Sequence, residues 1–145
     1  MKANDSVSAT DGAVAQLRHV LVAFSDQHDR ETLRCILVEC GLRPMPCSTL
    51  KEAQALLTSH AIGLAFCEDH LADGDYTDLL YDVRSSARPI PVVVCAPQLD
   101  LSLYLDAMEL GVYDFMVRPY RKADVAWIVE GALWKVGAKA VGAHN

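Results

Sequence analysis

Apolar runs separated by polar turns recur along the chain after a small, polar N-terminal segment. Continuous apolar runs are typical of strands that are buried on both faces of a parallel sheet. The second run contains two prolines, which restrict a strand to a sheet edge or to its first residues. The pattern therefore predicts strands at residues 19–24, 43–48, 62–67, 89–96 and 112–117.

Each of these runs is followed by apolar residues with helical spacing. After the first run, Leu33, Ile36, Leu37 and Cys40 recur at i, i+3, i+4 and i+7, and Gly41 ends the pattern. Further helices are predicted after residue 49 and at 77–84, 101–110 and 121–136. The helix at 101–110 carries one apolar stripe, formed by Leu101, Tyr104, Leu105 and Met108. Alternating strands and helices predict an α/β fold, a doubly wound five-stranded parallel sheet with helices on both faces.

Composition narrows the class of protein. The 145-residue chain has the length of one domain, and its net charge of −6 argues against nucleic-acid binding, which requires a cationic surface. The five cysteines form no CxxC pair and mostly lie in apolar runs, so we interpret them as buried thiols in a reducing cytoplasm. The sequence lacks a signal peptide, and no run reaches the roughly 20 apolar residues of a membrane span. A cytoplasmic protein without membrane contact is expected.

An acidic stretch, FCEDHLADGD at residues 66–75, follows the third predicted strand. In open α/β sheets, ligands and catalytic groups gather at the carboxyl ends of the strands. Three other predicted strands end in residues that we expect at the same edge, namely Phe24-Ser25-Asp26, Cys95-Ala96 and Arg118-Pro119. The sequence therefore predicts one pocket formed by four strand ends.

The five strand–helix units, the stretch MELGVYDFMVRPY and the LADGD loop resemble the response-regulator receiver domain, the CheY-like fold of two-component signalling. The resemblance covers residues 18–137 as the receiver domain and leaves 1–17 and 138–145 as flexible tails. It implies a flavodoxin-like sheet with strand order 2-1-3-4-5. In this family an acidic pair holds Mg²⁺, an aspartate accepts a phosphoryl group, and a Ser or Thr and a Lys bind its oxygens.

The acidic positions of that pocket are replaced in this chain. The acidic pair falls on Phe24 and Ser25, and counting three residues back from the leucine of the loop places Glu68 at the acceptor position. Asp26 and Asp69 each lie one residue after the position where the family has an acid, and one step along an extended strand turns a side chain to the opposite face. We therefore expect neither a metal ion nor a cofactor at this site.

The remaining pocket positions differ as well. Cys95 replaces the hydroxyl residue, Arg118 replaces the lysine, and only Pro119 is unchanged. A thiol is a poor hydrogen-bond partner, and a guanidinium group is not geometrically equivalent to an ammonium group. The sequence thus predicts a degenerate receiver, or pseudo-receiver, that has no enzymatic activity and is not phosphorylated in the usual way.

Two alternative functions and two roles of Glu68 stay open. The alternatives to a degenerate receiver are a Mg²⁺-dependent receiver that uses Asp69 as acceptor and Asp26 as metal ligand, and a sensor that binds a small ligand in the vacated pocket. Glu68 either pairs with Arg118 or imitates an acidified acceptor that holds one signalling state. Comparing partner binding by wild type and Glu68→Gln tests the second role, which equal affinities would contradict.

The last elements carry candidate switch and interface residues. Phe115 matches the rotating aromatic switch of the family, and a core aromatic on a buried strand is the plainer interpretation. Trp127 and Trp134 lie outside the stripe of the last helix that is predicted to face inward, so an exposed interface and a packed core both stay open for them. The resemblance implies protein partners, such as a histidine kinase, an output protein or a second copy that contacts the last helix.

Overall fold

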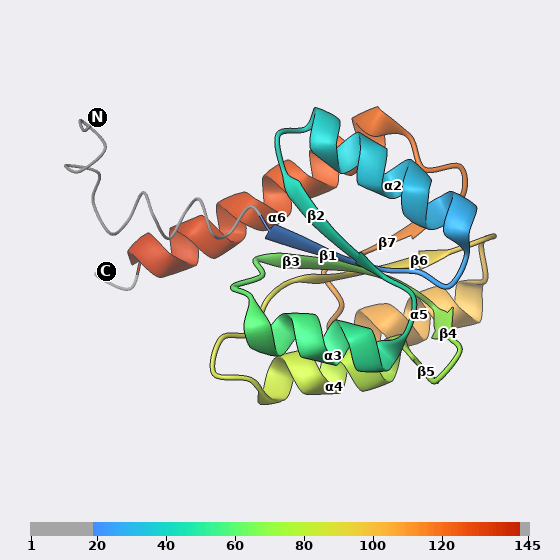
Figure 1. The fold of residues 1–145 in the computed structure, drawn as a ribbon, viewed down its shortest axis with the longest axis horizontal. Helices are drawn as coiled ribbons and strands as arrows, with labels where there is room; N and C mark the ends of the chain where they lie inside the picture. Colours follow the sequence, from blue (N-terminus) through green and yellow to red (C-terminus); the bar gives the residue numbers. More distant parts are fainter. Residues whose placement is uncertain (1–18, 143–145) are drawn as a thin grey trace.

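The computed structural model describes residues 19–142, and their side chains as far as Trp134. The predicted tail at residues 1–17 lies outside this range. A five-stranded parallel sheet forms the centre of the molecule, with helices on both of its faces (Figure 1). The strands of this sheet are β1 (His19–Ala23), β2 (Arg43–Cys47), β3 (Leu64–Glu68), β6 (Val92–Ala96) and β7 (Asp114–Val117).

The strands of the sheet lie in the order β2-β1-β3-β6-β7. Because β6 and β7 are the fourth and fifth strands of this sheet along the chain, the predicted order 2-1-3-4-5 is confirmed. Two short strands, β4 (His70–Leu71) and β5 (Gly74–Asp75), form a separate antiparallel hairpin inside the acidic loop. The sequence did not predict this hairpin, since its strands are only two residues long.

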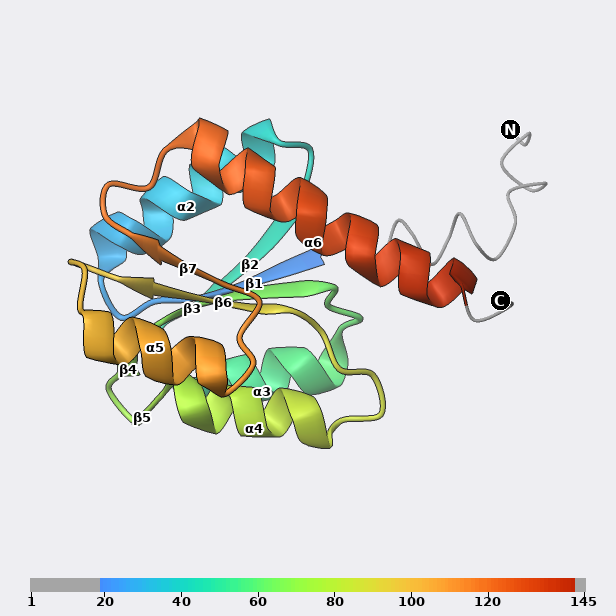
Figure 2. The ribbon, with the colours of Figure 1, turned by 180° about the vertical axis from the view of Figure 1, so that it is seen from behind.

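Five helices cover the sheet in the described part of the chain. They are α2 (Gln27–Glu39), α3 (Leu50–Ser59), α4 (Tyr76–Ser85), α5 (Leu101–Glu109) and α6 (Lys122–Gly142). Helices α2 and α6 lie on one face, and α3, α4 and α5 lie on the other (Figure 1 and Figure 2). No helix within the described range is both long and apolar enough to cross a membrane.

Helix α6 is longer than the sequence pattern indicated. It continues to Gly142, beyond the predicted helix end at residue 136 and into the segment 138–145 that was predicted as a tail. Its final turns include alanine and lysine, which are strong helix formers, so helical propensity continues past the last inward-facing position. Residues 143–145 lie outside the described range.

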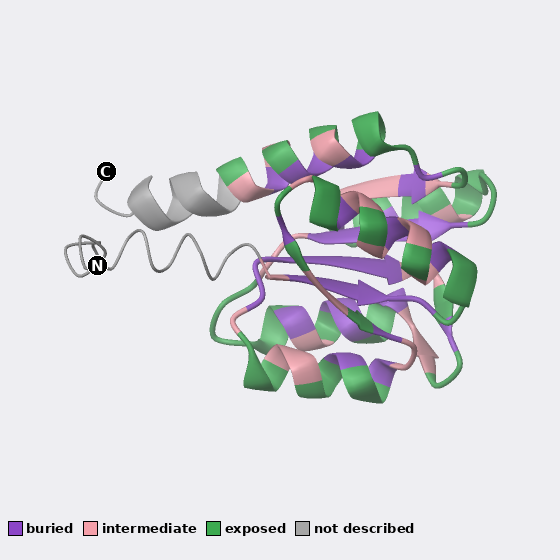
Figure 3. Cartoon of the chain, turned by 45° about the horizontal axis from the view of Figure 1, so that its top comes forward, coloured by how far each residue is buried: buried purple, intermediate pink, exposed green. Residues whose placement is uncertain are grey.

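The core consists of two apolar clusters, one on each face of the sheet. Along β1 and just after it, Val20, Val22 and Phe24 belong to the cluster under α2 and α6, whereas Leu21 and Ala23 belong to the cluster on the other face. This alternation follows from the two-residue period of side chains along a strand. Of the three central strands, β6 is buried along its whole length, and β1 and β3 are buried except for one end residue each, which explains why they form continuous apolar runs in the sequence (Figure 3).

Helix α5 departs from this packing. Ala107 is the only residue of this helix that is buried. The predicted apolar stripe lies at the surface instead, with exposed fractions between 36% for Tyr104 and Met108 and 64% for Leu101. Helix α5 therefore presents an apolar surface to its surroundings next to the edge strand β7.

Candidate functional site at the carboxyl ends of the strands

The structure brings the four strand ends together at one edge, which we call the strand-end site. The backbone N–H of Asp69 donates a hydrogen bond to the carbonyl oxygen of Cys95 at 2.9 Å, and the N–H of Arg118 donates to the carbonyl oxygen of Ala96 at 3.1 Å. These bonds extend the ladders β3–β6 and β6–β7 by one step. They place the side chains that follow each strand next to one another.

Glu68 is held by Ser25 at the centre of this site. One carboxylate oxygen of Glu68, Oε1, accepts hydrogen bonds from both the backbone N–H and the hydroxyl group of Ser25, at 2.8 and 2.7 Å. Both bonds involve a charged acceptor, which makes them stronger than bonds between neutral groups. The glutamate that the resemblance places at the acceptor position is thus tied to Ser25, which it places at one position of the acidic pair.

Arg118 binds Asp29, which corrects the predicted salt bridge between Arg118 and Glu68. Its Nε donates to both carboxylate oxygens of Asp29, at 3.1 and 2.9 Å, and its Nη2 donates to Oδ2 at 2.5 Å. Asp29 is only 3% exposed, in the first turn of α2. The hydrogen bonds that Arg118 donates to Asp29 raise the pKa of its guanidinium above its ordinary value. A planar guanidinium suits this two-pronged geometry better than a lysine would.

Asp26 is the N-cap of helix α2. Its Oδ1 accepts the backbone N–H of Asp29 at 2.9 Å, and its other oxygen lies 3.9 Å from Nη2 of Arg118. The hydrogen bond from that backbone N–H is the main cause that lowers the pKa of Asp26 from its ordinary value; desolvation opposes it, and the charge of Arg118 lowers the pKa further. Asp26 therefore starts the helix and faces Arg118.

Phe24 and Cys95 lie beneath the strand-end site and are fully buried. The ring of Phe24 packs edge-on against Tyr120, with ring centroids 6.0 Å apart and an interplanar angle of 74°. Burial raises the pKa of the Cys95 thiol well above its ordinary value, so this thiol stays protonated. Neither side chain offers an oxygen ligand to a cation or a strong donor to a phosphoryl group.

The four carboxylates of the acidic stretch have separate structural roles. Asp69 directly follows the last residue of β3, and its carboxylate lies 3.8 Å from Nε2 of His70. Asp73 accepts the backbone N–H groups of the first two residues of α3, and Asp75 is the N-cap of α4. The last two carboxylates therefore stabilise helix starts, a role beyond the loop polarity that the pattern indicated.

These arrangements decide whether the residues present fit Mg²⁺. Mg²⁺ requires several oxygen ligands in a near-octahedral arrangement. Asp26 caps α2, Asp29 binds Arg118, and the carboxylate of Asp69 lies beside His70. Among the residues that the structure describes, no three His, Cys, Asp or Glu side chains are grouped so that they could hold a metal ion. The strand-end site therefore does not fit the Mg²⁺ that the family resemblance implies.

Sequence reasoning missed Asp29, the partner of Arg118. Asp29, Leu33 and Leu37 follow one another at intervals of four, and all three are buried. An acid in phase with the inward stripe of a helix signals a buried partner, because a buried carboxylate without a counter-charge is costly. Arg30, also missed, donates from Nη1 to the carbonyl oxygen of Phe24 at 2.7 Å and so fixes the end of β1.

The predicted switch and interface residues lie along the edge strand and α6. Phe115 is partly buried and meets Tyr104 of α5 edge-on, with ring centroids 5.6 Å apart. Trp127 and Trp134 are each 76% exposed, so the structure places both at the surface and excludes the packed-core interpretation.

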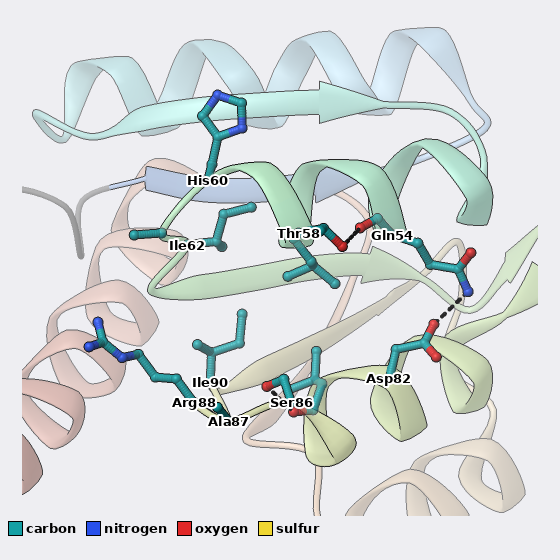
Figure 4. Close-up of a pocket in the computed structure, with 12 residues that line it drawn as sticks. Gln54, Thr58, His60, Ile62, Asp82, Ser86, Ala87, Arg88 and Ile90 are labelled. Carbon is teal, nitrogen blue, oxygen red and sulfur yellow. Dashed lines mark hydrogen bonds between the residues drawn. The ribbon is translucent and has the colours of Figure 1, made fainter.

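A separate hollow of about 500 Å³ opens between the C-terminal ends of α3 and α4 (Figure 4). Ile62 and Ile90, which precede β3 and β6, form its apolar wall, and Gln54 bonds to Asp82 across its rim at 2.7 Å. This hollow lies at the amino-terminal edge of the sheet. It is therefore distinct from the vacated pocket that the sequence proposed for a small ligand.

Comparison with curated proteins finds response regulators. The chain is 24% identical over 118 residues to the transcriptional regulatory protein FixJ of Bradyrhizobium diazoefficiens, a match that covers 79% of this chain and 56% of FixJ. It is 26% identical over 117 residues to the response regulator protein PilR of Pseudomonas aeruginosa, covering 80% of this chain and 26% of PilR. The chain thus spans little more than half of FixJ and about a quarter of PilR. No family model matches the chain.

Solved structures agree on the fold. NtrX from Brucella abortus superposes with a TM-score of 0.80 at 22% identity, over 87% of this chain and 29% of that one. The signal receiver domain of a LuxO repressor protein from Vibrio parahaemolyticus superposes with a TM-score of 0.78 at 15% identity, over 85% of this chain and 95% of that one. The beryllofluoride-activated NtrC4 receiver domain dimer superposes with a TM-score of 0.76 at 20% identity, over 82% of this chain and 98% of that one.

The described residues therefore form a doubly wound α/β domain of the flavodoxin-like type, in its CheY-like variant. More narrowly, this is the fold of response-regulator receiver domains, and the curated proteins that the chain resembles in sequence are response regulators.

Proposed function

We propose that this receiver domain is a non-enzymatic, atypical response regulator of the cytoplasm, which takes part in two-component or phosphorelay signalling through protein contact and is not phosphorylated in the usual way. The observation that carries the proposal is the double hydrogen bond from Ser25 to Glu68. A conventional receiver needs a free aspartate at that position and a metal-binding acid at the position of Ser25. Here both positions are occupied by groups that satisfy each other.

The charges around Glu68 support the same proposal. Phosphoryl transfer depends on cations that neutralise the developing charge on the transferred group. Arg118 stands at the position of the family's lysine, and its guanidinium is engaged by Asp29. Without a metal site and without a free cation at this position, the main sources of charge neutralisation for a phosphoryl group are missing from the described residues.

Intact-mass measurement after incubation of the full chain with Mg²⁺ and acetyl phosphate tests the proposal. We expect no gain in mass, because Glu68 is not an aspartate and no described group of side chains beside it could hold a metal ion. A gain of one phosphoryl group would overturn the proposal. If that gain is lost in Asp69→Asn and kept in Asp73→Asn, the alternative acceptor is Asp69, assisted by Asp26.

The partners of such a domain follow from the same proposal. A receiver that does not transfer phosphoryl groups acts by binding a histidine kinase, an output protein or a second copy through its last helix. Receivers expose the edge formed by their last strand and the helices beside it. In this chain that edge consists of α5, β7 and α6 and carries Trp127 and Trp134.

A further inference from the structure

The outer face of α6 carries two exposed tryptophans. Trp127 and Trp134 are each 76% exposed and are the only two tryptophans of the chain. Their spacing of seven residues places them on one side of the helix, two turns apart. Large aromatic side chains gathered at a surface are typical of contact sites in protein interfaces.

Carboxylates surround these tryptophans. A hollow of about 300 Å³ is lined by Trp127 and Trp134 together with Asp114 and Glu130, and a second hollow of about 260 Å³ is lined by Trp127 with Asp114 and Asp124. Among the described residues that line the two hollows there is no lysine or arginine. The side chains of Asp124 and Glu130 form no ion pair within the described part of the chain. The face is therefore both aromatic and anionic.

The first hollow depends on Gly131. A Cβ atom at Gly131 would lie 2.6 Å from the hydroxyl oxygen of Tyr113, which is closer than real Cβ contacts. The absent side chain lets Tyr113 approach α6 from the segment before β7. Three aromatic side chains, those of Tyr113, Trp127 and Trp134, therefore line one hollow with two carboxylates.

Helix α5 continues this surface on the other side of the edge strand. Figure 2 shows β7 running between α5 and α6. The sequence of α5, LSLYLDAME, contains two acids and no cation, and its apolar stripe is exposed. The α5–β7–α6 face, which comprises that stripe, Phe115 and the two tryptophans with their carboxylates, thus combines apolar area with negative charge.

We propose that the α5–β7–α6 face binds a cationic amphipathic segment of a partner protein, an inference that rests on the proposed function by protein contact. The apolar side of the segment covers the stripe of α5. One of its arginine or lysine side chains lies against Trp127 and Trp134 and reaches Asp114 and Glu130. Aromatic faces attract cations through their electron-rich centres, and the carboxylates add charge complementarity.

A second copy of this chain fits the face less well. A two-fold dimer brings the same patch of both copies together. The carboxylates of Asp114, Asp124 and Glu130 would then meet their own counterparts across the hollows, and like charges in contact disfavour an interface. Charge complementarity therefore favours a cationic partner over self-association.

Two synthetic helical peptides test this inference with the full chain. Both share one leucine and alanine face, and their other face carries arginine in one peptide and glutamate in the other. The two tryptophans of the chain report binding directly, through a change in their fluorescence. We expect the arginine peptide to bind at least about tenfold more tightly than the glutamate peptide. Its binding is expected to weaken as salt is added, because salt screens the attraction between the charges.

Substitution of one carboxylate locates the site. We expect Glu130→Gln to lower the affinity of the chain for the arginine peptide several-fold. Glu31→Gln makes the same charge change on α2 and is expected to leave that affinity unchanged. Equal affinity of the two peptides, binding of neither, or no effect of Glu130→Gln would overturn the inference. A dimer in sedimentation whose tryptophan emission is shifted to the blue would assign the face to a second copy. A phosphoryl gain in mass would instead overturn only the proposed function.

Discussion

Replacing Phe24 by aspartate is expected to lower the free energy of unfolding by about 4 kcal/mol or more, measured by urea denaturation followed by far-UV circular dichroism. Phe24 is fully buried and packs against Tyr120. The substitution removes an aromatic ring from the core and places a carboxylate where water is excluded. Although it restores one acid of the family's metal-binding pair, the loss is a large share of the roughly 5–15 kcal/mol of a typical domain.

Two controls separate the causes of this effect. Phe24→Leu keeps an apolar side chain and is expected to cost only about 1 kcal/mol. Ser25→Asp restores the second acid at an exposed position and is expected to have an effect on stability closer to that of Phe24→Leu. If Phe24→Asp proves as stable as Phe24→Leu, the position is not sealed from water and the account of a closed site is wrong.

Removing Arg118 is the second large effect that we expect. Arg118→Ala leaves the carboxylate of Asp29, only 3% exposed, without its counter-charge. Loss of one partner of a fully buried pair costs about 3–5 kcal/mol. Because the Arg118 side chain is 42% exposed and solvent screens the pair, we expect a smaller loss of about 2 kcal/mol in urea denaturation.

A surface pair supplies the matched control. Arg34 and Glu31 form an exposed salt bridge at 2.6 Å on the same helix as Asp29. Arg34→Ala is expected to change the free energy of unfolding by no more than about 0.5 kcal/mol. In a double-mutant cycle, Asp29→Ala combined with Arg118→Ala is expected to cost less than the sum of the two single changes. Equal losses for Arg118→Ala and Arg34→Ala would contradict the role assigned to the pair.

The fold could be predicted from the sequence because its signals are local and agree with one another. Continuous apolar runs marked the three central strands β1, β3 and β6, and burial on both sheet faces is the physical reason for those runs. Helix α5 shows the limit of this reasoning. Its stripe of Leu101, Tyr104, Leu105 and Met108 has helical spacing, yet it faces outward. Periodicity indicates that a helix has an apolar face and cannot indicate what covers that face.

The location of the strand-end site could be predicted from the sequence, but only some of the contacts between its side chains could. Counting residues from the loop leucine placed Glu68 at the end of the third strand, and the structure confirms that β3 ends at Glu68, with Asp69 just beyond it. The partners of Glu68 and Arg118 were not predicted, because they depend on three-dimensional contacts between residues far apart in sequence. Ser25 lies 43 residues from Glu68, and Asp29 lies 89 residues from Arg118. Once Asp29 holds the guanidinium, Ser25 is the remaining donor next to Glu68.

The most direct test of the account is whether the strand-end site accepts a phosphoryl analogue at all. Beryllofluoride with Mg²⁺ mimics a phosphoryl group on a receiver without depending on the choice of phosphate donor. We predict that adding both to the ¹⁵N-labelled chain leaves the amide resonances of Ser25, Asp69 and Arg118 unshifted, because Glu68 and Arg118 are already engaged. Saturable shifts of these resonances, absent when Mg²⁺ is omitted, would contradict the account.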